Sequence, residues 1–172
     1  MTGRTVRHIV VTLTALVIGA RAVSAQATPP DKVDFLGAAR SPISNSVAIP
    51  AGAAMVWVSG TVPSPSDTTK PAGSTARYGD TKTQAISALR NIEARLKERG
   101  LSMKDVVYIR CYLVVDKDKG SADVVGWNEA YGMFFNNPSN PVKTARSTVV
   151  VAALVSSEYL AEVEAFAVYP RP

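Results

Sequence analysis

The stretch ARSTVVVAALVSSEYLAEVEAFAV, residues 145–168, decides the fold because it holds two different strand patterns in succession. Its first part is an almost unbroken apolar run rich in β-branched valines, which is typical of a buried strand. Its second part alternates small apolar residues with larger or charged ones, as in a strand whose two faces meet different surroundings. We predict a final hairpin of two strands, from about residue 145 to 153 and from 161 to 168.

The last predicted strand has one face of small residues and one face that carries charge. The small face suits close packing against a helix, whereas two carboxylates make the other face unsuited to an ordinary core. The first face consists of Ala161, Val163, Ala165 and Ala167, and the second of Glu162, Glu164, Phe166 and Val168. The second face is therefore predicted to be solvated or to meet another subunit.

A single arginine, Arg146, stands at the start of the apolar run. Burying a guanidinium beside such a strand is costly unless an anion meets it. Two interpretations stay open at this point. Arg146 forms an ordinary surface ion pair, for example with Glu164, or it waits for the anionic group of a ligand. The strand pattern alone favours the ion pair, and only the wider motif context favours the ligand.

The rest of the chain supplies strands and helices in an order that indicates the fold class. The most regular helical pattern spans residues 80–99, where Asp80 or Thr81 can cap the start and Gly100 can end it. The other expected elements are a strand at 53–63, a long loop at 64–79, a strand at 105–115, a helix at 121–135 and a loop at 136–141. This order predicts an α+β fold, with the helices on one face of a mixed, mostly antiparallel sheet.

The N-terminal residues 1–25 have the pattern of a secretory signal peptide. A positive start precedes a mostly apolar stretch at 9–20, and small residues follow it, which predicts cleavage near Ala25 or Ala27. The apolar stretch is shorter than the roughly 20 residues that a spanning helix needs, so an uncut membrane anchor is the less favoured alternative. We expect a periplasmic or secreted protein without a stable membrane anchor after cleavage, in which residues 26–38 form a lead-in segment.

Charge and residue types exclude several functional classes. Removing residues 1–25 takes three of the 19 basic side chains and none of the 14 acidic ones, which leaves a net charge of +2. No basic cluster typical of nucleic-acid binding then remains, so no nucleic-acid partner is expected. The single histidine, His8, lies in the leader, which excludes a Ser–His or Cys–His catalytic pair from the mature chain. Cys111 is alone, so no disulfide within the chain is possible.

Four short motifs together resemble the reactive-intermediate deaminase (Rid, or YjgF-like) family. They occur in the family's order, and they are WVSGTVP at 57–63, WNEAYGMFF at 127–135, ARSTV at 145–149 and AEVEAFAV at 161–168. The resemblance makes residues 39–172 a single Rid-like domain. It implies a chorismate-mutase-like α+β fold, a homotrimer, and ligand clefts between subunits. It also implies hydrolysis of 2-imino acids, or related imines and enamines, to 2-oxo acids and ammonia.

The resemblance assigns roles to particular residues. Arg146 corresponds to the arginine that grips the ligand carboxylate, and Glu162 to the acid that positions the attacking water. Ser59, Gly60 and Asn128 correspond to residues that line the cleft and bind substrate. This chain departs from the family at two positions. Ile43 stands where deaminases usually have a tyrosine, and Thr148 stands at a substrate-binding position where many have a cysteine.

The chemistry is consistent with these assignments. A guanidinium offers two parallel N–H donors to a carboxylate, and a nearby carboxylate can orient a water and accept its proton. A protonated imine is already a good electrophile, so neither a metal nor a cofactor is expected. In the predicted hairpin Arg146 and Glu162 lie about 20 Å apart, at roughly 3.3 Å per residue, so they can share a ligand only across a subunit boundary.

Two other functions are compatible with parts of the same sequence pattern. A non-catalytic protein could use the same intersubunit cleft and the same arginine to hold a small carboxylate without turnover. Ribonuclease activity, a label that this family sometimes carries, is disfavoured by the charge balance and by the missing histidine.

Overall fold

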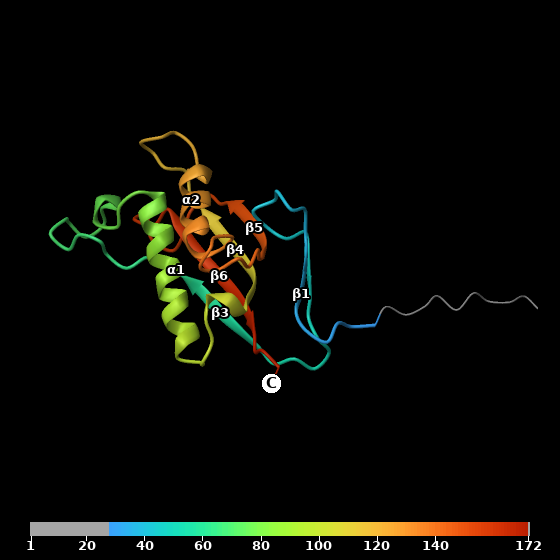
Figure 1. Ribbon diagram of the computed structural model, residues 1–172. Coiled ribbons are helices and arrows are strands. Elements are labelled where there is room, and N and C mark those ends of the chain that lie inside the picture. The colour runs from blue at the N-terminus through green and yellow to red at the C-terminus, as the bar shows by residue number, and fades with distance from the viewer. Residues whose placement is uncertain (1–27, 172) are drawn as a thin grey trace, which may run out of the picture.

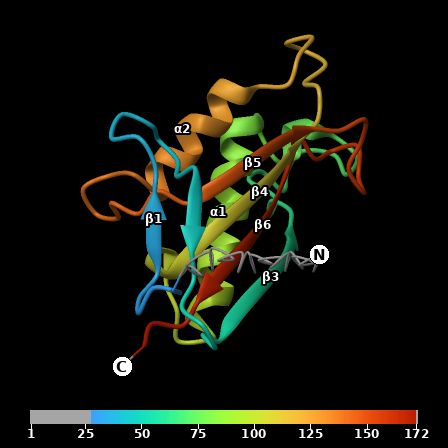
Figure 2. The same cartoon turned by 90° about the vertical axis from the view of Figure 1, so that its right-hand side faces the viewer.

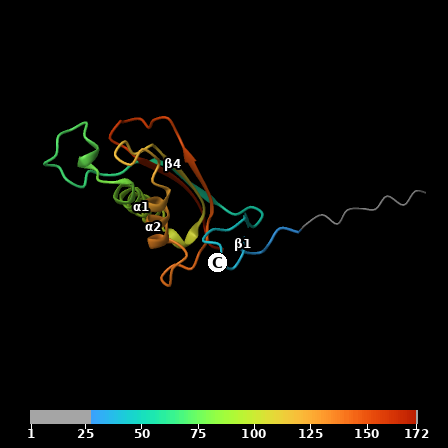
Figure 3. The same cartoon turned by 90° about the horizontal axis from the view of Figure 1, so that it is seen from above.

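The computed structural model describes residues 28–171, and the predicted signal peptide lies outside them. Within these residues four strands form a mixed sheet in the spatial order β3-β6-β4-β5, and both α-helices lie on one face of it (Figures 1 and 3). The elements are β1 (Asp34–Leu36), β2 (Ser46–Ala48), β3 (Met55–Thr61), η1 (Thr75–Arg77), α1 (Thr81–Lys97), η2 (Met103–Asp105), β4 (Val106–Leu113), α2 (Val124–Phe134), β5 (Ala145–Val150) and β6 (Ala161–Val168). The predicted α+β class is confirmed.

The helix α1 begins and ends where the sequence pattern predicts. The Asp80 side chain accepts a hydrogen bond from the backbone N–H of Thr83 at 2.8 Å, which caps the start. Beyond the other end, Gly100 has φ 72°, a conformation that glycine adopts without strain and that lets the chain turn away. The residues Ala85, Ala88, Leu89, Ile92 and Leu96 of α1 are fully buried. This apolar stripe fixes which side of the helix faces the sheet.

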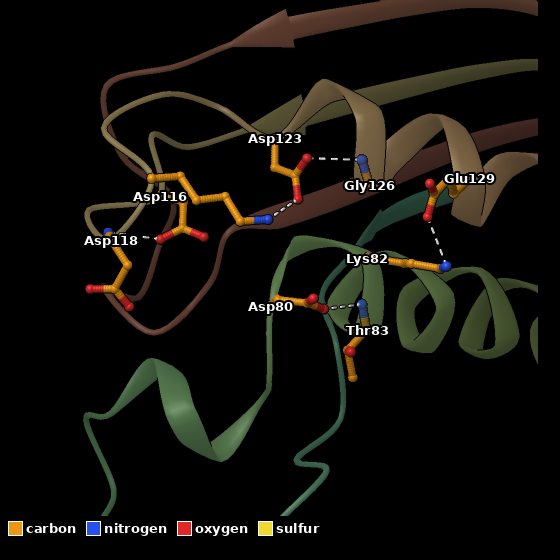
Figure 4. A network of polar contacts seen from close by, with 9 residues as sticks. Asp80, Lys82, Thr83, Asp116, Asp118, Asp123, Gly126 and Glu129 are labelled. Carbon is orange, nitrogen blue, oxygen red and sulfur yellow. Dashed lines mark hydrogen bonds and ion pairs between the residues drawn. The ribbon is translucent and has the colours of Figure 1, made fainter.

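The helix α2 lies beside α1 and is capped by Asp123, whose carboxylate accepts from the Gly126 N–H at 2.9 Å. A network of polar contacts connects the starts of the two helices (Figure 4). In it Lys119 donates to Asp123, and Lys82 of α1 pairs with Glu129 of α2 at 2.8 Å. The aromatic residues Trp127, Tyr131 and Phe135 are buried beneath α2. The network and the aromatic residues together hold α2 over the β4 and β5 side of the sheet.

The strand β6 lies between β3 and β4 in the sheet, and its two faces differ in burial as predicted. It pairs antiparallel with both β3 and β4. Its small residues Ala161, Val163, Ala165 and Ala167 are fully buried on the helix side. The carboxylates Glu162 and Glu164 are only partly buried, on the side away from the helices. We call this second side the outer face of the sheet.

The predicted final hairpin is wrong. The strand β5 does not pair with β6 but lies parallel to β4, with Arg146 beside Ile109, and β4 separates β5 from β6. The reason is the helix between β4 and β5, since a helical crossover of this length is the usual way to join parallel neighbours. Residues 151–160 then pass over the end of β4 to reach β6. Strand patterns indicate where strands lie in the chain but not which strand is the neighbour.

Two segments extend beyond the sheet. The β1–β2 hairpin stands beside β5 and is joined to it by a bridge between Ser44 and Ala145 (Figure 2). The loop at 64–79 folds on itself, because the Arg77 guanidinium donates to the backbone oxygens of Thr68 and Lys70. Across residues 28–171, no helix combines the length and the apolar character needed to cross a membrane.

Candidate functional site

Arg146 projects from β5 toward the helix side of the sheet, where side chains of α2 contact its guanidinium. Its Nη2 donates to the amide oxygen of Asn128 at 2.8 Å. Its guanidinium carbon lies 4.6 Å from the centre of the Tyr131 ring and 5.6 Å from that of Trp127. The electron-rich faces of these rings attract the cation and fix its position. The guanidinium is therefore held by neutral groups that all come from one helix.

The rings beside Arg146 are themselves fixed by hydrogen bonds. The indole N–H of Trp127 donates to the hydroxyl of Thr148 at 2.9 Å, and the hydroxyls of Tyr131 and Thr144 lie 3.0 Å apart. Burial raises the pKa of the Tyr131 phenol, which keeps the ring neutral. Burial also lowers the pKa of Arg146, although a guanidinium stays charged at any physiological pH. A rigid, partly desolvated cation results.

Arg146 has no anionic partner among residues 28–171. The ion pairs of this part of the chain are Lys82–Glu129, Lys97–Glu93, Arg110–Glu164 and Lys119–Asp123. Glu164, the partner considered from the sequence, is paired with Arg110 at 3.3 Å instead. The surface ion-pair interpretation of Arg146 therefore finds no support. We call Arg146, Asn128 and Thr148 the arginine half of the candidate site.

Glu162 and Gly60 lie together in a second group, which we call the carboxylate half, whereas Ser59 precedes Gly60 in β3 and lines a separate groove with Arg95, Glu98 and Arg99 of the α1 end. Glu162 lies on the outer face, close against the backbone of β3 at Gly60. A Cβ atom added to Gly60 would lie 2.0 Å from the Glu162 Oε1, so any larger residue at this position would displace the carboxylate. The β3–β6 register shifts between Val58 and Thr61, and this irregularity includes Ser59 and Gly60. Glu162 has no hydrogen-bond or ion-pair partner within the described residues.

The two halves lie on opposite faces of the sheet. Arg146 is beside Ile109, which is beside Ala165, so all three side chains point to the helices. Glu162 is three residues from Ala165 and therefore points the other way, because alternate residues of a strand share a face. The hairpin behind the sequence-based distance estimate is wrong, but its conclusion stands for a different reason. Within one chain Arg146 and Glu162 cannot contact the same small ligand.

A shallow hollow of about 430 Å³ lies beside Glu162 on the outer face. It is lined by Tyr112, Val151, Ala153, Leu154, Val155, Glu162 and Glu164. The Arg110 guanidinium and the Tyr112 hydroxyl both lie within hydrogen-bond distance of the Glu164 carboxylate, at 3.3 and 3.4 Å. The charge of Glu164 is thus partly balanced, whereas that of Glu162 is not. Most of the remaining lining is aliphatic.

The two departures from the family pattern also have clear positions. Ile43 packs its partly buried side chain against the core, so this position brings no hydroxyl toward a ligand. Thr148 holds the Trp127 indole, and its own side chain stays exposed. The sequence analysis gave Trp127 and Tyr131 no role at the site, whereas in the structure their rings lie beside the Arg146 guanidinium. Their spacing of four residues on one helix, with Asn128 between, was the available signal.

Potential metal ligands do not converge in this fold. Among residues 28–171 no group of three or more His, Cys, Asp or Glu side chains could hold a metal ion. The thiol of Cys111 is fully buried, and burial raises its pKa well above the usual range. A thiol in that state is a poor nucleophile, since the thiolate is the reactive form. Cys111 therefore belongs to the core.

Comparison with known proteins relates nearly the whole described chain to one family. The family described as endoribonuclease L-PSP matches residues 38–169. A RutC family protein of Pyrococcus abyssi is 37% identical over 89 residues, which are 52% of this chain and 62% of that protein. A RutC family protein of Pyrococcus horikoshii is 36% identical over 89 residues, or 52% and 63% of the two chains. Each match thus spans less than two thirds of the relative's length.

Solved structures share the fold. A Rid family protein of unknown function from Yersinia pestis, YyfB, has a TM-score of 0.62 at 22% identity, covering 80% of this chain and 99% of that one. TdcF of Escherichia coli, solved with bound serine, has a TM-score of 0.52 at 30% identity. The match covers 70% of this chain and 84% of TdcF. The YjgF gene product of Escherichia coli has a TM-score of 0.51 at 30% identity, and the match covers 70% of this chain and 84% of the YjgF chain.

Proposed function

Because this chain belongs to the Rid (YjgF-like) family, described as endoribonuclease L-PSP, we propose that it hydrolyses 2-imino acids, or related imines and enamines, to 2-oxo acids and ammonia. The observation that carries the proposal is Arg146, a half-buried cation that is held in place but has no anionic partner among residues 28–171. A cation fixed in this way is ready for a ligand carboxylate. Two charge-assisted hydrogen bonds from the guanidinium to that carboxylate would offset the free energy lost by partly desolvating Arg146.

The carboxylate half would supply the proton chemistry. With the protonated imino acid held by Arg146, a water attacks the carbon of the C=NH2+ group, a C–O bond forms, and the C=N π electrons move to nitrogen. The proton of the water passes to Glu162, which has no hydrogen-bond or ion-pair partner in the described part of the chain. Glu162 then returns the proton to the nitrogen. The C–N bond breaks, the carbonyl forms, and the nitrogen leaves as ammonium together with the hydroxyl proton.

This mechanism needs more than one copy of the chain, since the two halves face opposite sides of one sheet. We propose a homotrimer in which Arg146 of one subunit faces Glu162 of the partner subunit. The exposed aromatic residues of the outer face support a contact there, because the Trp57 side chain is 74% exposed and packs only edge-on against Phe166. Light scattering should give three times the monomer mass, and a monomer at micromolar concentration would contradict the composite site.

The proposed ligand is a small monocarboxylate. Support comes from the serine bound to TdcF, a relative 30% identical, and from the single unpaired cation of the arginine half. The hollow beside Glu162 is mainly aliphatic, and it contains two carboxylates that would repel a second negative charge on the ligand. Imines of small neutral amino acids thus fit better than those of aspartate or glutamate.

A second function is favoured by the two departures from the family pattern. Ile43 offers no hydroxyl, and the hydroxyl of Thr148 is engaged by Trp127. A protein that only binds a small carboxylate would need Arg146 and not Glu162. The same cleft could therefore serve binding without turnover.

The deciding experiment measures 2-oxo acid and ammonium release from imines generated in place by an amino-acid oxidase. The purified protein should speed this release, and an Arg146→Lys protein should do so far less. If the protein binds the carboxylate by calorimetry but does not change the release rate, the binding function replaces the enzymatic one. RNA added as a substrate should remain intact.

We also propose that the protein is exported, with cleavage near Ala25 or Ala27, on the basis of the leader pattern at 1–25. N-terminal sequencing of protein from the native host should give a start near Gln26 or Thr28. Recovery from the cytosol with Met1 intact would contradict export.

A further inference from the structure

A second hollow, of about 290 Å³, lies between the β1–β2 hairpin and the ends of β4 and β6. We call it the hairpin pocket. It is lined by Lys32, Val33, Phe35, Pro50, Lys104, Asp105, Val107, Val168, Tyr169, Pro170 and Arg171. None of these residues belongs to the arginine half or the carboxylate half, and the proposed imine chemistry uses none of them.

The pocket arises from the way the strands end. Strand β5 begins opposite Tyr108, so the first two residues of β4 have no β5 neighbour and a gap remains there. The β4–β6 register shifts between Val106 and Tyr108, which makes Val107 the extra residue of a bulge. Bulges re-aim a side chain and are frequent beside functional sites. The hairpin covers the gap from outside with Val33 and Phe35, and an apolar floor results.

The edge of the pocket carries an excess of positive charge. Lys32, Lys104 and Arg171 contribute three cations, and Asp105 contributes one carboxylate. That carboxylate is already engaged, because its Oδ2 accepts from the backbone N–H and the hydroxyl of Ser102 at 2.8 and 2.9 Å. The Arg171 guanidinium is fixed in position by a hydrogen bond to the backbone oxygen of Ala51. The three cations have no ion-pair partner within residues 28–171.

From this combination we propose that the hairpin pocket binds a small amphipathic monoanion, an aromatic or short aliphatic carboxylate with an apolar body. The apolar floor of Val107, Val168 and Phe35 would bury the body, and the cations at the edge would hold the carboxylate. The volume, near the lower end of the range for ligand pockets, suits a single ring or a short chain rather than a nucleotide.

The probe is phenylacetate, titrated into the purified protein by calorimetry and by NMR, with phenylacetamide as the uncharged analogue. We expect phenylacetate to bind and the amide to bind about ten-fold more weakly or not at all. The double variant Lys104→Glu/Arg171→Glu should weaken phenylacetate binding by at least about ten-fold, the expected sum of two reversed charges at a solvent-exposed edge. The matched control Lys70→Glu/Lys117→Glu changes the same charge on distant loops and should bind as the parent does.

Several results would overturn the proposal. The first is an absence of phenylacetate binding at about 10 mM, a concentration above which binding is too weak to define a site. The second is binding of phenylacetamide as tight as that of phenylacetate. The third is unchanged phenylacetate binding in the Lys104→Glu/Arg171→Glu protein. Loss of phenylacetate binding in an Arg146→Lys protein would place the anion at the arginine half instead. Binding only to vesicles that contain anionic lipid would make the patch a membrane contact and not a pocket for a free carboxylate. Imine hydrolysis by the Lys104→Glu/Arg171→Glu protein is measured in parallel, so the two proposals fail separately.

Discussion

The starts of the two helices and the candidate site differ in whether their charged side chains have hydrogen-bond or ion-pair partners. At the helix starts every carboxylate drawn in Figure 4 except the exposed Asp118 has a partner, and Asp80 and Asp123 each cap a helix. At the candidate site, neither Arg146, which contacts an amide and two aromatic rings, nor Glu162, which lies against Gly60, has an ion-pair partner among residues 28–171. Leaving a desolvated charge without a partner costs free energy, so a partly buried charge that is held in place without one indicates a place for a ligand. The difference separates charges that serve the fold from charges that serve binding.

The largest effect is expected at Glu162. The change Glu162→Gln removes the proton acceptor but keeps the shape of the side chain, so turnover should fall by roughly 100- to 10,000-fold while ligand affinity changes little. Release of 2-oxo acid measures turnover, and calorimetry measures affinity. The control Glu93→Gln, on α1, removes a carboxylate from a structural ion pair and should leave turnover unchanged. Full turnover in the Glu162→Gln protein would assign the proton chemistry elsewhere.

Arg146→Lys should give the next largest effect. Lysine keeps the positive charge but loses the two parallel donors, so carboxylate binding should weaken by about 10- to 150-fold, or about 1.5–3 kcal/mol. Calorimetry measures the affinity, and light scattering checks that the assembly is unchanged. The control Arg90→Lys lies on an exposed part of α1 and should bind normally. A lower melting temperature with unchanged binding would make Arg146 a structural residue after all.

Asp123→Ala tests whether the carboxylates at the helix starts stabilise the fold. It removes the cap of α2 and the partner of Lys119, so the free energy of unfolding should fall by about 1 kcal/mol, within a usual range of about 0.5–2. Urea denaturation measures this value, and residual activity per folded molecule should match that of the parent. The control Asp118→Ala removes an exposed carboxylate that caps no helix. Equal loss in both proteins would contradict a capping role.

The smallest effect concerns pH. The hydrogen bond from the Thr83 N–H lowers the pKa of Asp80, and the contacts with Lys119 and the Gly126 N–H lower that of Asp123. Groups whose pKa is lower in the folded chain stabilise it above their unfolded pKa, near 3.8, and this contribution is lost as pH falls through the folded pKa. Stability should therefore decline below about pH 4. Asp80→Asn keeps a capping group without a titrating proton, so part of this decline should disappear in that protein.

Local sequence patterns predicted most of the elements but not all of their neighbours. The helix α1 and the two faces of β6 follow from patterns within a few residues. The separation of Arg146 from Glu162 was expected from a hairpin that does not form, and it holds because the two residues lie on opposite faces of the sheet. The neighbour of β5 did not, because strand pairing depends on where the intervening helix places the chain and not on the strand itself. The same limit explains why Trp127 and Tyr131 were not expected around Arg146.

The sequence by itself determined which residues are chemically unusual: an arginine at the start of an apolar run, and a glutamate on the polar side of a strand. It also determined the fold class, since helical and strand periodicities are properties of consecutive residues. Only the tertiary structure decided that Arg146 lacks an anionic partner among residues 28–171, that Glu164 pairs with Arg110, and that Glu162 lies against Gly60. These facts depend on contacts between residues far apart in the chain, and such contacts exist only after the sheet has formed and α2 has packed upon it.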